Sequence, residues 1–336
     1  MSFFNYKIRE EVLREAVHKY SDGEFGSQLI STSMNGIYSV QNQERDYILR
    51  FSHPLKAESQ IRGEIEFIQY LYSGGADVVK PLLSKGKTFV EKGGSNKKLI
   101  VSAFERAVGN AVDINNKDIW NDKLFFTWGK TIGKIHRLTK TYIPSSNACK
   151  RNAWNEESIC VENSIFSPDL IVSDTNQVVC RKWKKLLSEL NSLPKDKDSY
   201  GLVHSDLHML NFFVNEGRIT VFDFDDCCYN WFSYDIAVAF YDSLYGIPFM
   251  ERNLRKEFIK RFSNSFFEGY FMENNLSDYW IDKIPLFMKF RDFLLYMVSI
   301  AHLNINSMDI EEREMFNHIR INLENDIPYV DFDPTH

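Results

Sequence analysis

The segment from Gly201 to Asp226, GLVHSDLHMLNFFVNEGRITVFDFDD, constrains the fold of this chain more than any other part of it. Its apolar start predicts a strand that leads into Asp206, and a polar loop then runs to Asn211. A hairpin over Glu216-Gly217 follows and brings the chain back to Asp223. One loop and two strand ends therefore carry three oxygen-bearing side chains toward the same place.

The chemistry of these three side chains indicates phosphoryl transfer. Hard oxygen ligands suit Mg²⁺, which takes few protein ligands and completes its shell with phosphate and water. An Asp five residues before an Asn, with a second Asp one hairpin later, is the arrangement found in kinases. There the first Asp orients the attacking hydroxyl and accepts its proton, while the Asn and the second Asp hold metal on the nucleotide phosphates. These roles fall here on Asp206, Asn211 and Asp223; a strand end with solvated acids is the alternative for Asp223.

The pattern H-x-D-x-x-x-x-N, followed by a hydrophobic residue and D-F-D, resembles the aminoglycoside phosphotransferase and choline kinase family. Members of this family are protein-kinase-like enzymes that phosphorylate small molecules, and the resemblance covers most of the chain. It implies ATP and Mg²⁺ as cofactors and a small-molecule hydroxyl as the acceptor. Tyr234-Asp235-Ile236-Ala237 matches the family's D-I-A, in which the Asp braces the catalytic loop, and we expect His204 to support that loop structurally.

The same resemblance implies nucleotide-binding residues in the first part of the chain. Tyr47–Phe51 is similar to the third strand of the nucleotide lobe, so Arg50 takes the place of the cation that grips the α- and β-phosphates. Glu64, fourteen residues further on in a predicted helix, stands where the family places the ion-pair partner of that cation; a surface charge is the alternative. Phe104-Glu105-Arg106 resembles the hinge whose backbone receives the adenine. Gly36 is the one glycine at the position of the phosphate-capping loop.

The chain departs from the family pattern around these motifs. Ser205 replaces the usual glycine of His-Gly-Asp, and Met209-Leu210 replaces Pro-Gly inside the loop. These replacements concern the shape of the loop and leave Asp206 and Asn211 intact. Arg50 stands where protein kinases use Lys, but a guanidinium group is always charged and can hold a phosphate with two hydrogen bonds, so the role survives the exchange.

Four residues after the hairpin are candidates for the acceptor site. Acidic groups beside aromatic rings favour a cationic or amine-bearing acceptor, through Coulomb attraction and cation–π contacts. The candidates are Asp225, Asp226, Trp231 and Tyr234. Alternatives stay open for both kinds of residue: the carboxylates could bind metal or water, and the aromatic side chains could belong to the core.

Periodicity predicts an α+β chain that changes character near residue 107. Before that point, short β-type runs joined by turns such as Asn35-Gly36 predict an antiparallel sheet. A short helix over Lys7–Tyr20 precedes this sheet, and one helix over Lys56–Tyr72 lies on it. Helical periodicity dominates afterwards, over 115–140, 174–191 and most of 231–325.

Together with the resemblance, this pattern implies a bilobal protein-kinase-like fold. We expect a small antiparallel-sheet nucleotide lobe over residues 1–107. A larger, mainly helical lobe over residues 108–336 would carry the catalytic loop and the acceptor site.

Composition excludes several classes of protein. The 336 residues carry a net charge of −6, with a pI near 5.8, which argues against a protein that coats nucleic acid or an anionic membrane. No apolar run approaches the ~18 residues that a membrane span needs, and the N-terminus becomes charged before a signal-peptide core could form. We expect a cytoplasmic protein without nucleic-acid or membrane partners, and the oligomeric state is left open. Neither zinc-site nor disulfide spacing is present among Cys149, Cys160, Cys180, Cys227 and Cys228.

Two further motifs have a structural interpretation. Gly129-Lys130-Thr131 imitates the end of a P-loop, but Leu124 stands at the position of the first glycine and the motif lies within a helical pattern. His204 and His208 flank Asp206 as in a metallohydrolase, but such a site would need further zinc-type ligands.

The sequence therefore predicts an ATP-dependent phosphotransferase that moves the γ-phosphate to a hydroxyl of a small, amine-bearing molecule. Aminoglycosides, choline and homoserine are acceptors of this kind in the family. One alternative is a protein Ser/Thr kinase of the same fold. The other is a non-catalytic nucleotide-binding protein, which the presence of Asp206, Asn211 and Asp223 disfavours.

Overall fold

The computed structural model describes residues 7–32, 34–43, 45–94, 98–156, 177–244, 246–247, 251–302, 310–329 and 332. The chain forms two compact units. The first comprises residues 1–111, 141–151 and 211–225, so it includes two segments that follow residue 107 in the sequence. The second comprises residues 112–140, 152–210 and 226–336.

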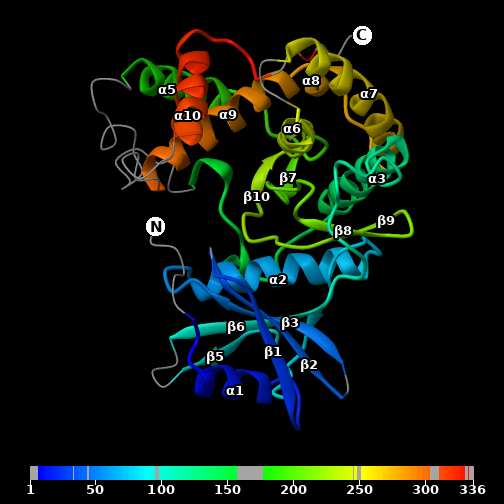
Figure 1. Ribbon diagram of the computed structural model, residues 1–336, viewed down its shortest axis with the longest axis vertical. Helices are drawn as coiled ribbons and strands as arrows, with labels where there is room; N and C mark the ends of the chain where they lie inside the picture. Colours follow the sequence, from blue (N-terminus) through cyan, green and yellow to red (C-terminus); the bar gives the residue numbers. More distant parts are fainter. Residues whose placement is uncertain are drawn as a thin grey trace. The chain divides into compact units, whose positions relative to one another are not determined.

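The first unit is built on an antiparallel sheet (Figure 1). Its strand order is β1-β2-β3-β6-β4, and β5 also pairs with β6. The strands are β1 (Phe25–Ser31), β2 (Gly36–Asn42), β3 (Asp46–Ser52), β4 (Pro81–Leu82), β5 (Glu91–Gly93) and β6 (Leu99–Glu105). The predicted meander of three strands is therefore present as β1, β2 and β3. The strand predicted over 77–83 is shorter, because only Pro81 and Leu82 pair with β6.

One helix covers each face of this sheet (Figure 1). The side chains of α1 (Glu10–His18) pack against the face that presents Tyr47, Leu49 and Phe51 of β3. Because side chains alternate along a strand, Arg50 points to the other face, where α2 (Glu58–Ser73) lies. The sequence predicted only α2 on the sheet. Helix α1 is needed as well, because β3 is buried on both faces and α2 covers only one of them.

The first unit also contains the hairpin of β8 (Phe212–Asn215) and β9 (Arg218–Val221). Glu216 and Gly217 form its turn with φ values of 49° and 77°, the left-handed conformation that tight two-residue hairpins require. The predicted strand was expected to reach Phe224, but β9 ends at Val221 because Asp223 also has a left-handed backbone, with φ 63°.

Helices dominate the second unit. They are α3 (Asp122–Thr139), α5 (Gln177–Asn191), α6 (Phe232–Ser243), α7 (Arg252–Phe271), α8 (Asp278–Ile281), α9 (Ile284–His302) and α10 (Ile310–Glu324). The helix predicted from residue 115 begins only at Asp122, because the side chain of Asn121 caps it by accepting from the backbone N–H of Lys123 and Leu124. Two short 3-10 helices, Asn147–Cys149 in the first unit and Trp154–Glu156 in the second, complete the element order.

The backbones of helices α3 and α7 touch where the two helices cross. A Cβ atom on Gly129 would lie 1.9 Å from the carbonyl oxygen of Phe266, and one on Gly269 would lie 1.9 Å from that of Phe126. The P-loop-like motif lies within α3, as its helical pattern predicted, and its glycine allows this close helix packing.

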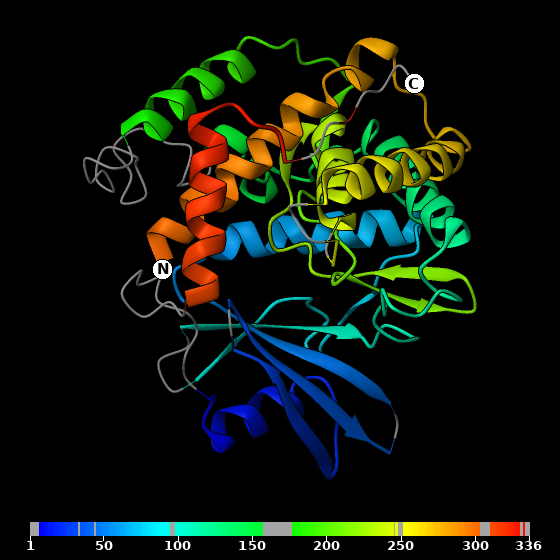
Figure 2. The same cartoon turned by 45° about the horizontal axis from the view of Figure 1, so that its top comes forward.

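Helix α6 forms the centre of the second unit, with almost every side chain buried. It packs against α9, and α10 lies against α9 and α5 (Figure 2). A two-stranded ladder of β7 (Tyr200–Val203) and β10 (Cys228–Trp231) precedes it. The sequence did not predict β10. No helix in the described parts of the chain is long and apolar enough to cross a membrane.

Candidate active site

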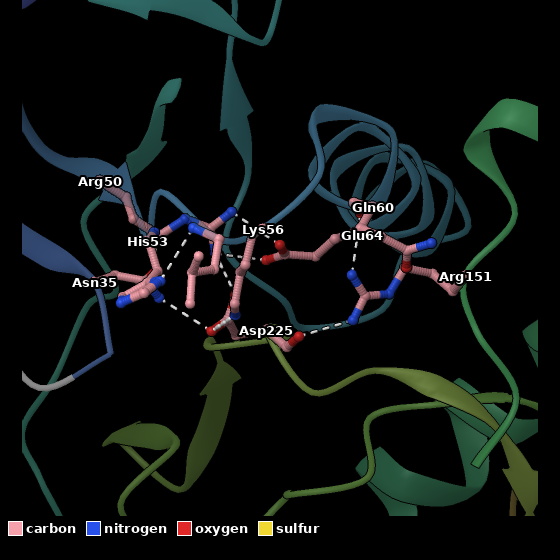
Figure 3. Close-up of polar contacts among 9 residues, drawn as sticks. Asn35, Arg50, His53, Lys56, Gln60, Glu64, Arg151 and Asp225 are labelled. Atoms are coloured by element: carbon pink, nitrogen blue, oxygen red, sulfur yellow. Dashed lines mark hydrogen bonds and ion pairs between the residues drawn. The ribbon is translucent and has the colours of Figure 1, made fainter. Parts of the chain in front are cut away.

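Arg50 and Glu64 form a buried ion pair in the first unit. The two terminal nitrogens of the guanidinium group donate to the two carboxylate oxygens of Glu64 at 2.6 and 2.9 Å, in the two-pronged geometry that makes such pairs strong (Figure 3). Both side chains are at most 5% exposed. The alternative of a surface charge for Glu64 is therefore wrong. The guanidinium group also lies 5.1 Å from the ring centre of Phe104.

Asp225 joins this pair through a second set of contacts. Its carboxylate forms an ion pair with Lys56 and accepts from the side-chain amide of Asn35 at 3.1 Å (Figure 3). Arg50 lies 3.9 Å away. Burial would raise the pKa of Asp225, but the charges of Lys56 and Arg50 outweigh it and lower the pKa to about 2. Asp225 is therefore an anion within the first unit.

The contacts of Asp225 tie together segments that are distant in the sequence. Asn35 lies between β1 and β2, next to Gly36, and its side-chain oxygen accepts from the backbone N–H of His53 at 3.2 Å. Arg151 donates to the backbone carbonyl of Asp225 at 2.8 Å and to that of Gln60 at 3.1 Å (Figure 3). The turn at Gly36 is thus fixed, through Asn35, to the turn after β9 that contains Asp225.

The β8–β9 hairpin brings Asn211 and Asp223 to the same end. Phe212 pairs with Val221 at the end of the hairpin opposite its turn. The backbone N–H of Phe222 donates to the carbonyl of Asn211 at 2.9 Å. Asn211 precedes the first strand and Asp223 follows the second, so both lie at this end of the hairpin. No cluster of three or more His, Cys, Asp or Glu side chains in the described residues could hold a metal alone. One amide and one carboxylate suit Mg²⁺, which takes most of its remaining ligands from phosphate and water.

The hinge residues follow β6. Phe104 is buried, whereas Glu105 is exposed and forms an ion pair with Lys80 at 3.0 Å. Arg106 is exposed and its guanidinium group lies 3.5 Å from the hydroxyl of Ser39. The side chains of this segment therefore do not converge on one point, which agrees with a role for the backbone.

In the second unit, Asp235 holds the start of the catalytic loop. Its two carboxylate oxygens accept from the backbone N–H of His204 at 3.2 Å and of Ser205 at 2.6 Å. Ser205 has φ 69°, the conformation that a glycine adopts freely. The loop thus keeps the shape expected for the family glycine, because two hydrogen bonds to Asp235 hold the serine there.

Hydrogen bonds through His136 hold the carboxylate of Asp235 in place. His136, on α3, bonds to the same carboxylate at 3.2 Å and to the hydroxyl of Tyr270 at 3.0 Å. Burial lowers the pKa of His136 and outweighs the influence of Asp235, so the imidazole is neutral. Asp235 does not cap α6, because Trp231 is the N-cap residue and no side chain caps that end.

Asp206 has a cationic or hydrogen-bonding partner on each carboxylate oxygen. Oδ1 accepts from Arg291 of α9 at 2.7 Å, and Oδ2 lies 3.2 Å from Nε2 of His208. Burial would raise the pKa of Asp206, but the bond from His208 and the charge of Arg291 hold it well below its ordinary value. Asp206 is therefore ionised at neutral pH.

Asp206 and Arg291 line a cavity of about 540 Å³ in the second unit. Its carboxylates, besides Asp206, are those of Asp226 and Asp242. Much of its wall is apolar and comes from Trp154, Met209, Phe290, Leu294, Leu295 and Val298. A volume of this size is typical of sites for drug-sized ligands.

Two of the predicted acceptor residues do not line this cavity. Asp226 and Tyr234 do, but Trp231 is fully buried and its indole N–H donates to the carbonyl of Pro194. Trp231 therefore belongs to the core, the alternative that the sequence left open. Asp225 belongs to the first unit, where Lys56 and Asn35 bind it.

Comparison with known proteins identifies the family. The model of the phosphotransferase enzyme family (APH) matches residues 31–272. An amicoumacin kinase of Bacillus subtilis (strain 168) is 35% identical over 327 residues, which cover 96% of this chain and 94% of that protein. The chain belongs to the phosphotransferase enzyme family. It is an ATP-dependent enzyme that phosphorylates a small molecule, so the alternatives of a protein kinase and of a non-catalytic protein are wrong.

Solved structures confirm the protein-kinase-like fold of this family member. An amicoumacin kinase in complex with AMP-PNP, Ca²⁺ and the ligand Ami is 30% identical, with a TM-score of 0.89 over 98% of this chain and 97% of the other. A microcompartment-associated aminopropanol kinase shares the fold, with 19% identity and a TM-score of 0.72 over 94% of this chain and 95% of the other.

Several site residues of this phosphotransferase were not predicted from the sequence. Lys56 and Asn35 flank predicted motifs, and only their contacts with Asp225 reveal them. Asp242 lies one turn beyond the D-I-A motif. Arg291 lies outside the residues that match the family model, so no motif points to it.

The described cysteines, Cys149, Cys180, Cys227 and Cys228, form no disulfide bond with one another. Cys160 lies outside the described residues.

Proposed function

We propose that this enzyme transfers the γ-phosphate of ATP to a hydroxyl of an acceptor that carries both an amine and a sizeable apolar part. The cavity beside Asp206 supports this most directly. Asp206 and Asp242 are bound to Arg291, so the carboxylate of Asp226 is the cavity group that attracts a cation. The apolar wall of Trp154, Phe290 and Leu294 favours a hydrocarbon or aromatic body. At about 540 Å³ it is larger than choline or homoserine would need.

The full-length relative with 35% identity is an amicoumacin kinase, and so is the solved structure with a TM-score of 0.89. Amicoumacin is therefore the acceptor that we propose first. Identity of this degree over nearly the whole of both chains supports a related acceptor.

For the nucleotide, we assign roles in the first unit. Arg50, held by Glu64, would contact the α- and β-phosphates, and the backbone at Phe104, Glu105 and Arg106 would receive the adenine. The turn at Gly36 would cover the phosphates. The buried ion pair of Arg50 with Glu64 supports these roles, and the solved relative is a complex with AMP-PNP.

Asn211 and Asp223 would hold a divalent cation on the phosphates. Such a cation neutralises the charge that develops on the transferred phosphoryl group. The relative's complex contains Ca²⁺, which binds oxygen ligands as Mg²⁺ does.

Asp206 would orient the acceptor hydroxyl and take its proton. Its low pKa makes it a weak base, so positioning contributes more than early proton removal. This agrees with phosphoryl transfer, in which alignment and electrostatic stabilisation supply most of the rate.

The test is an ATP-consumption assay with Mg²⁺ and separate acceptors. Amicoumacin, choline and a neutral polyol of amicoumacin's size form the series, and mass spectrometry identifies the phosphorylated product. We expect amicoumacin to have the highest kcat/KM. Faster turnover of the polyol would contradict the amine requirement, and faster turnover of choline would contradict the need for an apolar body.

A further inference from the structure

Arg291 is a buried cation that contacts Asp206 and lies outside the residues that match the family model. Its side chain is 9% exposed. A single terminal nitrogen, Nη2, donates to Oδ1 of Asp206 at 2.7 Å and to Oδ2 of Asp242 at 3.2 Å. Arg291 therefore links the catalytic loop to two other elements.

Both of those elements belong to the core of the second unit. Asp242 lies on α6 and Arg291 on α9, and these two helices pack against each other. A group held by two packed helices is placed more accurately than a group held by its own loop. Without such a contact, the carboxylate of an aspartate rotates broadly about its last bond, and its two oxygens are interchangeable.

The contacts of Asp206 distinguish its two oxygens. Oδ1 accepts from Arg291, whereas Oδ2 lies near Nε2 of His208, whose Nδ1 accepts from the backbone N–H of Leu210 at 3.2 Å. A carboxylate oxygen has two lone pairs, so Oδ2 can accept from a substrate hydroxyl in addition to His208.

We propose that Arg291, held by Asp242, is a positioning residue for phosphoryl transfer: it fixes Oδ1 of Asp206 so that Oδ2 receives the acceptor hydroxyl. This inference rests on the proposed function, because it assigns a role within that reaction. The acceptor O–H donates to Oδ2, the oxygen attacks the γ-phosphorus as the bond to ADP breaks, and the proton passes to Asp206. Arg291 changes no bond in this step and acts only on the orientation of Asp206.

The experiment compares the wild type with R291M, R291K and the control R137M. Methionine has a similar length without the charge, and lysine keeps the charge without the planar group. Arg137 is a matched control because it forms an exposed ion pair with Glu273 in the same unit, away from the cavity. Both amicoumacin phosphorylation and the slow hydrolysis of Mg-ATP by water are measured, together with thermal melting.

We expect R291M to lower kcat about 100-fold, with KM for ATP within about twofold of the wild type, because misplacement of a reacting group by 1 Å has an effect of this size. R291K should recover only part of this loss, and R137M should keep the kcat of the wild type. If R291M fails to fold, R291K and D242N carry the test, and each should lower kcat with little change in KM for ATP.

The inference is overturned if R291M, or R291K where R291M does not fold, keeps kcat within twofold of the wild type. If only R291K can be measured, an unchanged kcat would mean that a positive charge at position 291 is sufficient and that the planar guanidinium group does not position Asp206. Failure of the wild type to phosphorylate amicoumacin would contradict the proposed acceptor instead. ATP hydrolysis would then still measure the effect of Arg291 on Asp206, since water replaces the acceptor hydroxyl.

Discussion

Two residues of the candidate site have a backbone conformation that residues other than glycine rarely adopt. Ser205 has φ 69° and Asp223 has φ 63°. Such conformations cost about 1 kcal/mol or more each and persist where surrounding contacts determine them. For Ser205 these contacts are the hydrogen bonds to Asp235. Strain at these two positions agrees with the proposed site, in which the backbone orients the side chains of Asp206 and Asp223 at a cost in local stability.

The left-handed backbone of Asp223 guides the test of the metal site. D223A should abolish Mg-ATP turnover, because it removes the one carboxylate of the proposed pair. Alanine also resists φ 63°, so D223G is needed as a second variant that accepts this conformation freely. We expect both variants to lose at least about 100-fold in kcat while D223G melts like the wild type. Normal activity in D223G would contradict the assignment.

Asp226 tests the charge of the acceptor cavity. It lines the cavity and is exposed, so D226N should leave the fold unchanged. Loss of one carboxylate near a bound amine should raise KM for amicoumacin about fivefold, which corresponds to about 1 kcal/mol, and leave KM for ATP unchanged. The control is D278N, because Asp278 does not line the cavity. An unchanged KM for amicoumacin in D226N would show that the amine is recognised elsewhere.

At the scale of elements, one ion pair connects β3 to α2. Arg50 and Glu64 lie on neighbouring elements of the first unit and are both buried, so neither can be neutralised without leaving the other unpaired. Burial would lower the pKa of Arg50, but Glu64 and the nearby aspartates raise it. The guanidinium group therefore remains charged for phosphate binding.

We predict that E64Q destabilises the enzyme by about 3–5 kcal/mol, the usual effect of breaking a buried ion pair. Arg50 would then turn toward Asp225, which lies 3.9 Å away, so KM for ATP should also rise. Urea unfolding and steady-state kinetics measure the two effects. The matched control is E10Q, which breaks the exposed pair of Glu10 with Arg14 and should change stability by less than about 1 kcal/mol. Equal effects of the two variants would contradict this role.

Local patterns predicted the elements that depend on neighbouring residues. The stripe of Ile61, Ile65 and Ile68 predicted α2, and Glu216-Gly217 predicted the β8–β9 turn. Strand β10 was missed because it pairs with β7, and no turn or alternation near Cys228 indicates this distant partner. The motif residues could be located because their spacing is local. Strand β10 could not be located because its partner is distant in the sequence.

The rest of the site depends on contacts between residues far apart in the sequence. Asp225 is the last residue of the recognised D-F-D motif, yet its partner Lys56 is 169 residues away. Arg291 and Asp206 are 85 residues apart, and a single Arg in an apolar helix carries no signal of its own. A family resemblance supplied Arg50 and Glu64, whereas periodicity alone would have left Glu64 on the surface.

At the scale of the whole molecule, the proposed roles are divided between the two units. The nucleotide and metal residues belong to the first, and Asp206 with the acceptor cavity belongs to the second. Variants of the nucleotide residues Arg50 and Glu64 should therefore act mainly on KM for ATP, variants of the metal residue Asp223 on kcat, and variants that line the cavity on the acceptor or on kcat.

The stability of the whole enzyme should depend on pH through Asp292. This carboxyl is buried next to the site, accepts from the hydroxyl of Tyr241 at 2.8 Å, and has its pKa raised to about 6 by burial, which outweighs the influence of Tyr241 and Arg255. The unfolded chain releases this proton near the ordinary value of 3.8. Between these two values the folded state binds more protons, so the contribution of Asp292 to stability falls as pH rises from about 4 to 6 and stays unfavourable above.

Replacement of Asp292 by Asn should therefore stabilise the enzyme at pH 7.5 and have little effect at pH 4.5. Asparagine stays neutral and can still accept from Tyr241, so up to about 3 kcal/mol of unfolding free energy should be gained at the higher pH. Urea unfolding of the wild type and D292N at both pH values measures this difference. The control is D118N, because Asp118 is exposed and should give the same small change at both. If D292N changed stability equally at both pH values, Asp292 would already be ionised in the folded enzyme at pH 4.5, and burial would not govern its titration.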